Sequence, residues 1–148
     1  MKILGIDPGL INTGFGLLEQ NGSKITLIDY GIVHPPKNDH LSVRLKVIYN
    51  DVLSIIKKYK PQVCVVEEVF YSKNFKSSLL LGQARAAVLI AAAMMGVDVA
   101  EYSARKIKQS ITGNGNSSKE QIQFMVKNIL VMRELPKPID ASDALAIA

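Results

Sequence analysis

The fold is decided by residues 2–33, which read KILGIDPGLINTGFGLLEQNGSKITLIDYGIV. The apolar run at 2–6 ends in the strong breaker Asp7-Pro8-Gly9, which is the pattern of a buried strand followed by a turn. Two alternating runs follow, and they are separated by Asn21-Gly22, a dipeptide typical of a tight hairpin turn. This stretch therefore predicts three strands in antiparallel order, at 2–6, 13–20 and 24–33.

Helical and strand patterns alternate over the rest of the chain. The expected elements are a helix at 41–59, a strand at 63–66, a helix ending near 95, a strand at 97–102, and helices at 104–111, 118–132 and 139–148. The order βββαβαβααα predicts one α/β domain over residues 1–148, with a mixed five-stranded sheet flanked by helices. The last helix stops without a cap or a polar tail, so we expect the natural protein to continue and this helix to be truncated.

The composition indicates a compact globular protein with a basic surface. Of its 148 residues, 48% are hydrophobic, and Lys and Arg outnumber Asp and Glu by 18 to 13. A basic surface suits a polyanionic partner such as nucleic acid. The only cysteine, Cys64, lies in an apolar run and is expected to be a buried, reduced thiol. No apolar run approaches the roughly 20 residues of a membrane span, and no signal peptide is evident. We therefore expect a cytoplasmic protein without a membrane partner.

Four acidic residues stand where predicted elements begin or end. Asp7 ends the first strand and Glu67 the fourth, while Asp140 and Asp143 are three residues apart and so share one face of the last helix. If the two strands are neighbours, the four carboxylates converge and repel one another unless a divalent cation neutralises them. Oxygen ligands suit Mg²⁺ or Mn²⁺, and a pair of such ions can hydrolyse a phosphodiester. The sequence therefore predicts a metal-dependent hydrolytic site.

Each of these acids also has a purely structural interpretation. Asp7 can belong to an ordinary turn, and Glu67, like its neighbour Glu68, can be a surface acid. Asp140 can cap the last helix, and Asp143 can complement the dipole of that helix. A metal site explains all four residues at once, whereas the structural interpretations explain them one at a time.

Four motifs carry a resemblance to a known family. They are Gly5-Ile6-Asp7-Pro8-Gly9 with Thr13-Gly14, Val66-Glu67-Glu68-Val69-Phe70, Leu81-Gly82-Gln83-Ala84-Arg85, and Asp140-Ala141-Ser142-Asp143-Ala144-Leu145-Ala146. In this order they resemble the RuvC family of crossover-junction (Holliday junction) endodeoxyribonucleases, of the ribonuclease H-like superfamily. The resemblance covers essentially all 148 residues, and it favours Glu67 over Glu68 as the metal ligand. Family members usually continue past the last helix, and the early end is the one departure.

The resemblance implies a ribonuclease H-like fold and an endonuclease of homologous recombination and DNA repair. A homodimer would bind a four-way DNA junction and nick two opposing strands symmetrically, leaving ligatable 5′-phosphate and 3′-hydroxyl ends. Asp7 would bridge two Mg²⁺ ions per active site, with Glu67, Asp140 and Asp143 as the other ligands, and Mn²⁺ is expected to substitute. The family also suggests a branch-migration helicase as a partner.

Aromatic and basic side chains follow the second motif and suit stacking on unpaired bases, with cations on phosphates. By resemblance Phe70 is the expected base-stacking wedge, although the residues alone fit a core position. Lys108 and Lys119 match phosphate-binding positions near the metals, although most charge runs are solvated faces. The other expected DNA contacts are Tyr71, Lys73, Asn74, Lys76, Arg85 and Arg105. The apolar helix at 84–95 is either a core helix or, by analogy, part of the dimer interface.

Three other functions fit parts of the sequence. A phosphotransferase of the actin and sugar-kinase fold has a similar Asp-x-Gly and Thr-Gly phosphate loop, but 148 residues leave no room for its second domain. A non-catalytic junction-binding module would not need the full carboxylate set. A ribonuclease H-like nuclease acting on RNA–DNA hybrids or on RNA would share this site, and the aromatic pair after Glu67 only weakly favours a junction.

Overall fold

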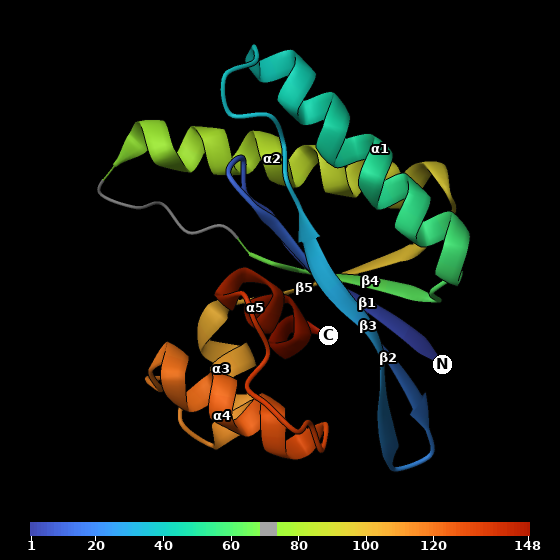
Figure 1. Cartoon of the computed structure of the whole chain (residues 1–148), viewed down its shortest axis with the longest axis vertical. Coiled ribbons are helices and arrows are strands. Elements are labelled where there is room, and N and C mark those ends of the chain that lie inside the picture. Colours follow the sequence, from blue (N-terminus) through green and yellow to red (C-terminus); the bar gives the residue numbers. More distant parts are fainter. Residues whose placement is uncertain (69–73) are drawn as a thin grey trace.

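The computed structural model describes residues 1–68 and 74–148, and it has a five-stranded sheet with helices on both faces (Figure 1). The strands are β1 (Lys2–Asp7), β2 (Thr13–Asn21), β3 (Lys24–Val33), β4 (Val63–Glu67) and β5 (Asp98–Tyr102). The helices are α1 (Leu41–Tyr59), α2 (Phe75–Met94), α3 (Ala104–Thr112), α4 (Lys119–Ile129) and α5 (Ile139–Ile147). This confirms the predicted α/β class and the predicted order of elements.

The sheet has the order β3-β2-β1-β4-β5, so β1 is its central strand. β1 pairs antiparallel with β2 and parallel with β4, and β4 pairs parallel with β5. The predicted hairpin is confirmed, since Asn21 pairs with Lys24 and the turn places Gly22 at φ +61. Glycine has no Cβ atom and therefore adopts this left-handed conformation at little steric cost. The sheet is therefore mixed, as predicted.

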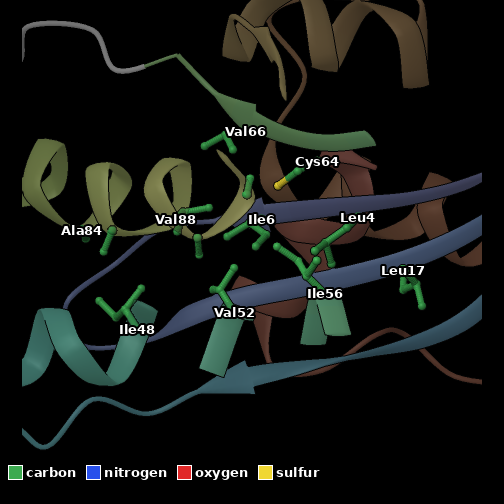
Figure 2. Close-up of a cluster of buried hydrophobic side chains, with 13 residues drawn as sticks. Leu4, Ile6, Leu17, Ile48, Val52, Ile56, Cys64, Val66, Ala84 and Val88 are labelled. Carbon is green, nitrogen blue, oxygen red and sulfur yellow. The ribbon is translucent and has the colours of Figure 1, made fainter. Parts of the chain in front are cut away.

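The face that carries α1 and α2 holds the largest apolar core (Figure 2). Ile48, Val52 and Ile56 recur every four residues along α1 and are almost completely buried. Helix α2 contributes mainly alanines, whose small side chains allow it to lie close to its neighbours. Cys64 is buried in this core as a free thiol, as predicted, and burial raises its pKa to about 12.

The opposite face carries α3, α4 and α5, and its apolar clusters are smaller (Figure 1). Helix α4 ends at Ile129, three residues before the predicted end. The reason is local: Val131 has φ +52, a left-handed conformation that cannot continue an α-helix. The open polar region described below lies on this face.

Helix α2 differs from the expectation that no apolar segment approaches the length of a membrane span. By length and composition alone it could cross a membrane, because an 18-residue window has a mean hydropathy of 1.5. One such helix is weak evidence, since a core helix of a globular protein meets the same criteria. Only 28% of that window is buried, so α2 also presents an apolar outer face.

Candidate active site

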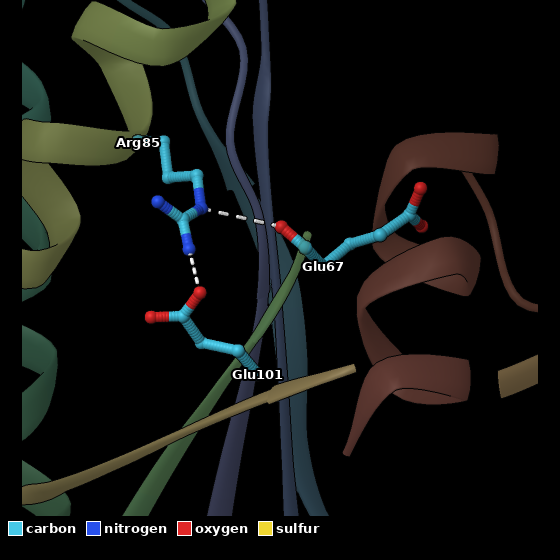
Figure 3. Close-up of polar contacts among 3 residues, drawn as sticks. All are labelled: Glu67, Arg85 and Glu101. Carbon is cyan, nitrogen blue, oxygen red and sulfur yellow. Dashed lines mark hydrogen bonds and ion pairs between the residues drawn. The ribbon is translucent and has the colours of Figure 1, made fainter. Parts of the chain in front are cut away.

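Two of the four predicted acids are brought together by the sheet itself. Ile6 of β1 lies opposite Val66 of β4 in a parallel pair, so the next residues, Asp7 and Glu67, stand side by side at the same sheet edge. The Glu67 carboxylate points toward α5 (Figure 3). Its neighbour Glu68 is exposed, and its main-chain N–H donates to the Tyr102 carbonyl at 2.9 Å. Of the two adjacent glutamates, Glu67 is the one that lines the cleft.

The other two acids are brought in by α5, which packs directly on the backbone of β2. A methyl group added to Gly14 would lie 2.0 Å from the Asp140 carbonyl oxygen, and one on Gly16 would lie 2.8 Å from the Cα of Leu145. Only glycine permits so close an approach between a strand and a helix. The Gly-x-Gly pattern of β2 thus sets the height of α5 above the sheet, and with it the positions of Asp140 and Asp143.

Asp140 and Asp143 each have a polar partner. The N-cap of α5 is Pro138 and no side chain caps this helix, so the interpretation of Asp140 as its N-cap is wrong. Asp140 instead accepts a hydrogen bond from the side-chain amide of Asn12, at 2.9 Å. Asp143 forms an ion pair with Lys119, at 2.6 Å. Lys119 is the first residue of α4, where Ser118 and Gln121 form a capping box.

Two adjacent hollows share Asp7. A cleft of about 210 Å³ is lined by Asp7, Glu67 and Asp143 together with Lys108 and Lys119. A shallower hollow of about 400 Å³ is lined by Asp7, Asp140 and the loop 8–12. The larger groove of about 470 Å³ at the end of α5 is mainly apolar and has no carboxylate in its lining, so we do not assign the chemistry to it.

The local electrostatics show what this convergence does to the acids. Burial, followed by repulsion from Asp143, Glu67 and Asp140, raises the pKa of Asp7 to about 7. Burial and the nearby Asp143 likewise raise the pKa of Glu67, while Lys119 and Lys108 act in the opposite direction. The hydrogen bond to Asp143 raises the pKa of Lys119. The site is therefore short of positive charge around Asp7.

The donor set fits a hard divalent cation by its chemistry. Four carboxylates supply only oxygen ligands, and a cation would relieve the repulsion that raises the pKa of Asp7. Within residues 1–68 and 74–148, no three acidic, histidine or cysteine side chains already surround one point. Asp140 and Asp143 are engaged by Asn12 and Lys119. In both cases the contact is to Oδ2, so the other oxygen of each carboxylate is left to face a cation.

Arg85 binds two groups of the protein itself and does not line the cleft with the carboxylates. Its Nε donates to the main-chain carbonyl of Glu67 at 3.3 Å, and its guanidinium forms an ion pair with Glu101 of β5. In Figure 3 it reaches the end of β4 from α2, whereas the Glu67 carboxylate points away toward α5. Arg85 therefore stabilises the end of β4 that carries Glu67. The predicted contact of Arg85 with DNA stays a prediction.

The remaining predicted DNA contacts divide into three groups. Lys108 and Lys119 lie in the cleft with the carboxylates. Lys76 and Arg105 are exposed on α2 and α3, and Asn74 caps α2 by accepting from the Ser77 N–H at 3.2 Å. Phe70, Tyr71 and Lys73 lie outside the described residues. Sequence reasoning missed Asn12 and His34, which no motif or local spacing connects to Asp140.

Comparison with known proteins gives consistent matches over the whole chain. The family described as "Crossover junction endodeoxyribonuclease RuvC" matches residues 3–148. A protein of that name from Caldicellulosiruptor saccharolyticus is 44% identical, over 100% of this chain and 90% of the relative. The structure of Thermus thermophilus RuvC in complex with a Holliday junction substrate is 34% identical, with a TM-score of 0.94, over 100% of this chain and 90% of that one. The yeast mitochondrial Holliday junction resolvase Ydc2 shares only the fold, with 14% identity and a TM-score of 0.68, over 98% of this chain and 76% of that one.

Proposed function

This chain belongs to the RuvC family of crossover junction endodeoxyribonucleases, and from that premise we propose that it resolves four-way DNA junctions at the site of Asp7, Glu67, Asp140 and Asp143. The observation that carries the assignment of the site is the convergence of these carboxylates from β1, β4 and α5 beside two lysines. The likeness to a resolvase bound to a Holliday junction supports a junction as the substrate.

We propose Mg²⁺ as the cofactor, with Mn²⁺ as a substitute and two ions per active site. Such ions, when bound, supply an activated water and stabilise the leaving oxygen of a phosphodiester. Asp7 lines both hollows, and this supports Asp7 as a ligand that both ions would share. Glu67 and Asp143 would bind from the side of the cleft, and Asp140 from the side of the loop 8–12.

The lysines of the cleft act on the substrate strand. Lys108 and Lys119 lie beside three of the carboxylates and would attract the DNA phosphate into a site that is otherwise acidic. Lys119 has a second role, because its ion pair with Asp143 balances one carboxylate before the ion arrives. The ammonium group of Lys119 would be available to a phosphate oxygen when the carboxylates hold a cation.

Junction recognition is proposed for residues that follow Glu67 and Glu68 along the chain. Phe70 would stack on an unpaired base at the junction centre, with Tyr71 and Lys73 beside it. The exposed cations Lys76 and Arg105 would contact the phosphates of the arms.

We propose that the chain forms a homodimer and that the outer face of α2 is the interface between the two subunits. Leu79, Ile90 and Met94 are more than half exposed, and their spacing of 11 and 4 residues places them on one side of the helix. A two-fold dimer presents two active sites to a two-fold junction, as symmetric paired nicks require. Each nick is proposed to leave 5′-phosphate and 3′-hydroxyl ends. A cytoplasmic location is proposed from the sequence features given above, and a branch-migration helicase partner is proposed from the family resemblance alone.

The test is cleavage of three labelled substrates in the presence of Mg²⁺: a four-way junction, a linear duplex and an RNA–DNA hybrid. The proposal expects paired nicks at symmetric positions in the junction and none in the other two. Cleavage of the hybrid without cleavage of the junction would replace the proposal by a ribonuclease function. Junction binding without cleavage under any divalent ion would leave only a binding module.

A further inference from the structure

A chain of polar side chains leads from Asp140 to the surface of the protein. Asn12 Nδ2 donates to Asp140 Oδ2 at 2.9 Å, and Asn12 Oδ1 faces His34 Nδ1 at 3.0 Å. Because the amide nitrogen of Asn12 is used by Asp140, its amide oxygen is left to accept, so His34 Nδ1 is the donor in the second contact. His34 thereby selects the amide orientation that turns the NH₂ group of Asn12 toward the carboxylate.

The backbone around Asn12 is also held in place. The hydroxyl of the fully buried Thr13 accepts from the Gly9 N–H at 3.2 Å and donates to the Gly9 carbonyl at 2.8 Å. From α1, Arg44 donates to the Leu10 carbonyl at 2.5 Å. The loop between β1 and β2 is thus restrained on both sides of Asn12, so the Asn12 amide is presented to Asp140 by a preformed loop.

We propose that Asn12, oriented by His34, is a positioning residue for Asp140. This inference rests on the proposed function, because it takes Asp140 to be a metal ligand. The amide holds one oxygen of Asp140 and leaves the other free to face an ion. Unlike the ammonium group at Asp143, the neutral amide donates without supplying a charge that competes with the cation. Donors of this kind orient ligating carboxylates, and their loss typically lowers metal affinity by about 10- to 100-fold.

The test measures Mn²⁺ binding to the full chain, without DNA, by calorimetric titration. Asn12→Leu keeps a similar side-chain shape but removes the donor, and we expect its Mn²⁺ affinity to fall by about tenfold. Junction affinity measured without divalent ions is expected to stay unchanged, because the net charge of the site is the same. Asp140→Asn is measured in parallel and is expected to lose more affinity than Asn12→Leu.

Variants at the exposed His34 test the same chain without disturbing the loop. His34→Leu removes the donor to Asn12, and we expect a loss of Mn²⁺ affinity of about threefold, below the usual range for direct partners of a ligand, because His34 acts only through Asn12. His34→Asn places an amide N–H near the position of Nδ1 and should restore the affinity. His40, the only other histidine, makes no side-chain cap bond to α1, so His40→Leu is the matched control.

Three outcomes would overturn the inference. If Asn12→Leu binds Mn²⁺ as the unchanged protein does while Asp140→Asn is weakened, the metal site stands and the positioning role is wrong. If Asp140→Asn also binds normally, the proposed ligand set itself fails. If His34→Asn is no better than His34→Leu, or His40→Leu is equally weakened, His34 has no part in orienting Asn12.

Discussion

The two carboxylates on strands and the two on the helix reach the same site by different means. Asp7 and Glu67 are adjacent because β1 and β4 are hydrogen-bonded neighbours. Asp140 and Asp143 arrive through the packing of α5 on β2 and through side-chain contacts with Asn12 and Lys119. The main-chain ladder therefore secures the strand pair, whereas tertiary contacts secure the helix pair.

The two pairs also differ in how their charge is balanced. Lys119 pairs with Asp143 and the Asn12 amide donates to Asp140, but no salt bridge among residues 1–68 and 74–148 involves Asp7 or Glu67. Accordingly, the pKa of Asp7 is raised to about 7, chiefly by burial and then by the neighbouring acids. The strand pair therefore has the less compensated charge, whereas the position of the helix pair depends on tertiary contacts that a single substitution can remove.

The largest effect is expected from Asp7→Asn, because Asp7 lines both hollows and would contact both ions. Cleavage of a four-way junction should fall by about 10³-fold or more, as is common when a central catalytic group is removed. Junction binding, measured by gel shift, should be retained. Loss of binding together with cleavage would show that Asp7 is structural.

The charge difference between the pairs predicts a pH dependence of stability in the absence of divalent ions. The pKa of Asp7 in the folded protein, about 7, lies above its ordinary value of 3.8, so the folded state holds this proton more tightly. The resulting stability is fully present below about pH 4 and is lost as the pH rises through about 7. The free energy of unfolding should fall over this window by up to about 4 kcal/mol.

Denaturant unfolding in EDTA at pH 5 and pH 8 measures this effect. Asp7→Asn should reduce the difference between the two pH values, and Mg²⁺ should restore stability to the unchanged protein at pH 8. An equal pH dependence in Asp7→Asn would assign the effect to other groups.

Gly14→Ala tests whether the close packing of α5 on β2 positions the helix pair. The new methyl group would lie 2.0 Å from the Asp140 carbonyl oxygen, so α5 must move away from β2. We expect a loss of stability of about 1–3 kcal/mol and, because misplacement by about 1 Å suffices, a loss of cleavage of about 100-fold. Thermal unfolding and junction nicking measure the two.

Gly82→Ala is the control for the Gly14 variant. Gly82 lies in α2 with nothing within 4 Å of an added methyl group, so unfolding should be unchanged or slightly harder. Full cleavage by Gly14→Ala would mean that the height of α5 does not position the helix pair.

A smaller effect is expected from Arg85→Gln, which acts on the strand pair. This substitution removes the ion pair with Glu101 and the hydrogen bond from Arg85 Nε to the Glu67 carbonyl. Cleavage should fall by about tenfold, as for other residues that support a ligand, with junction affinity unchanged. Glu101→Gln should have a similar effect, and the double variant should be little worse than either. A fall in junction affinity for Arg85→Gln alone would favour the DNA contact instead.

The difference between the pairs also explains what the sequence could predict. The strand ends at Asp7 and Glu67 follow from local apolar runs and breakers, and the family motif separated Glu67 from Glu68. The convergence of Asp140 with them was predicted, but its bond to Asn12 joins residues 128 positions apart and leaves no local signal. The N-cap interpretation of Asp140 failed for a local reason, because α5 begins at Ile139 and Pro138 is its N-cap. Arg85 was assigned by its charge, and its partner on β5 could not be read from its own segment.

In the proposed function, the strand pair and the helix pair bind divalent ions as one site. The most direct measurement is the stoichiometry and affinity of Mn²⁺ binding at pH 8 for the unchanged protein, Asp7→Asn and Asp143→Asn. We predict about two ions per chain for the unchanged protein, loss of both in Asp7→Asn, and weakened binding in Asp143→Asn. Binding of Mn²⁺ by Asp7→Asn with unchanged stoichiometry and affinity would contradict it.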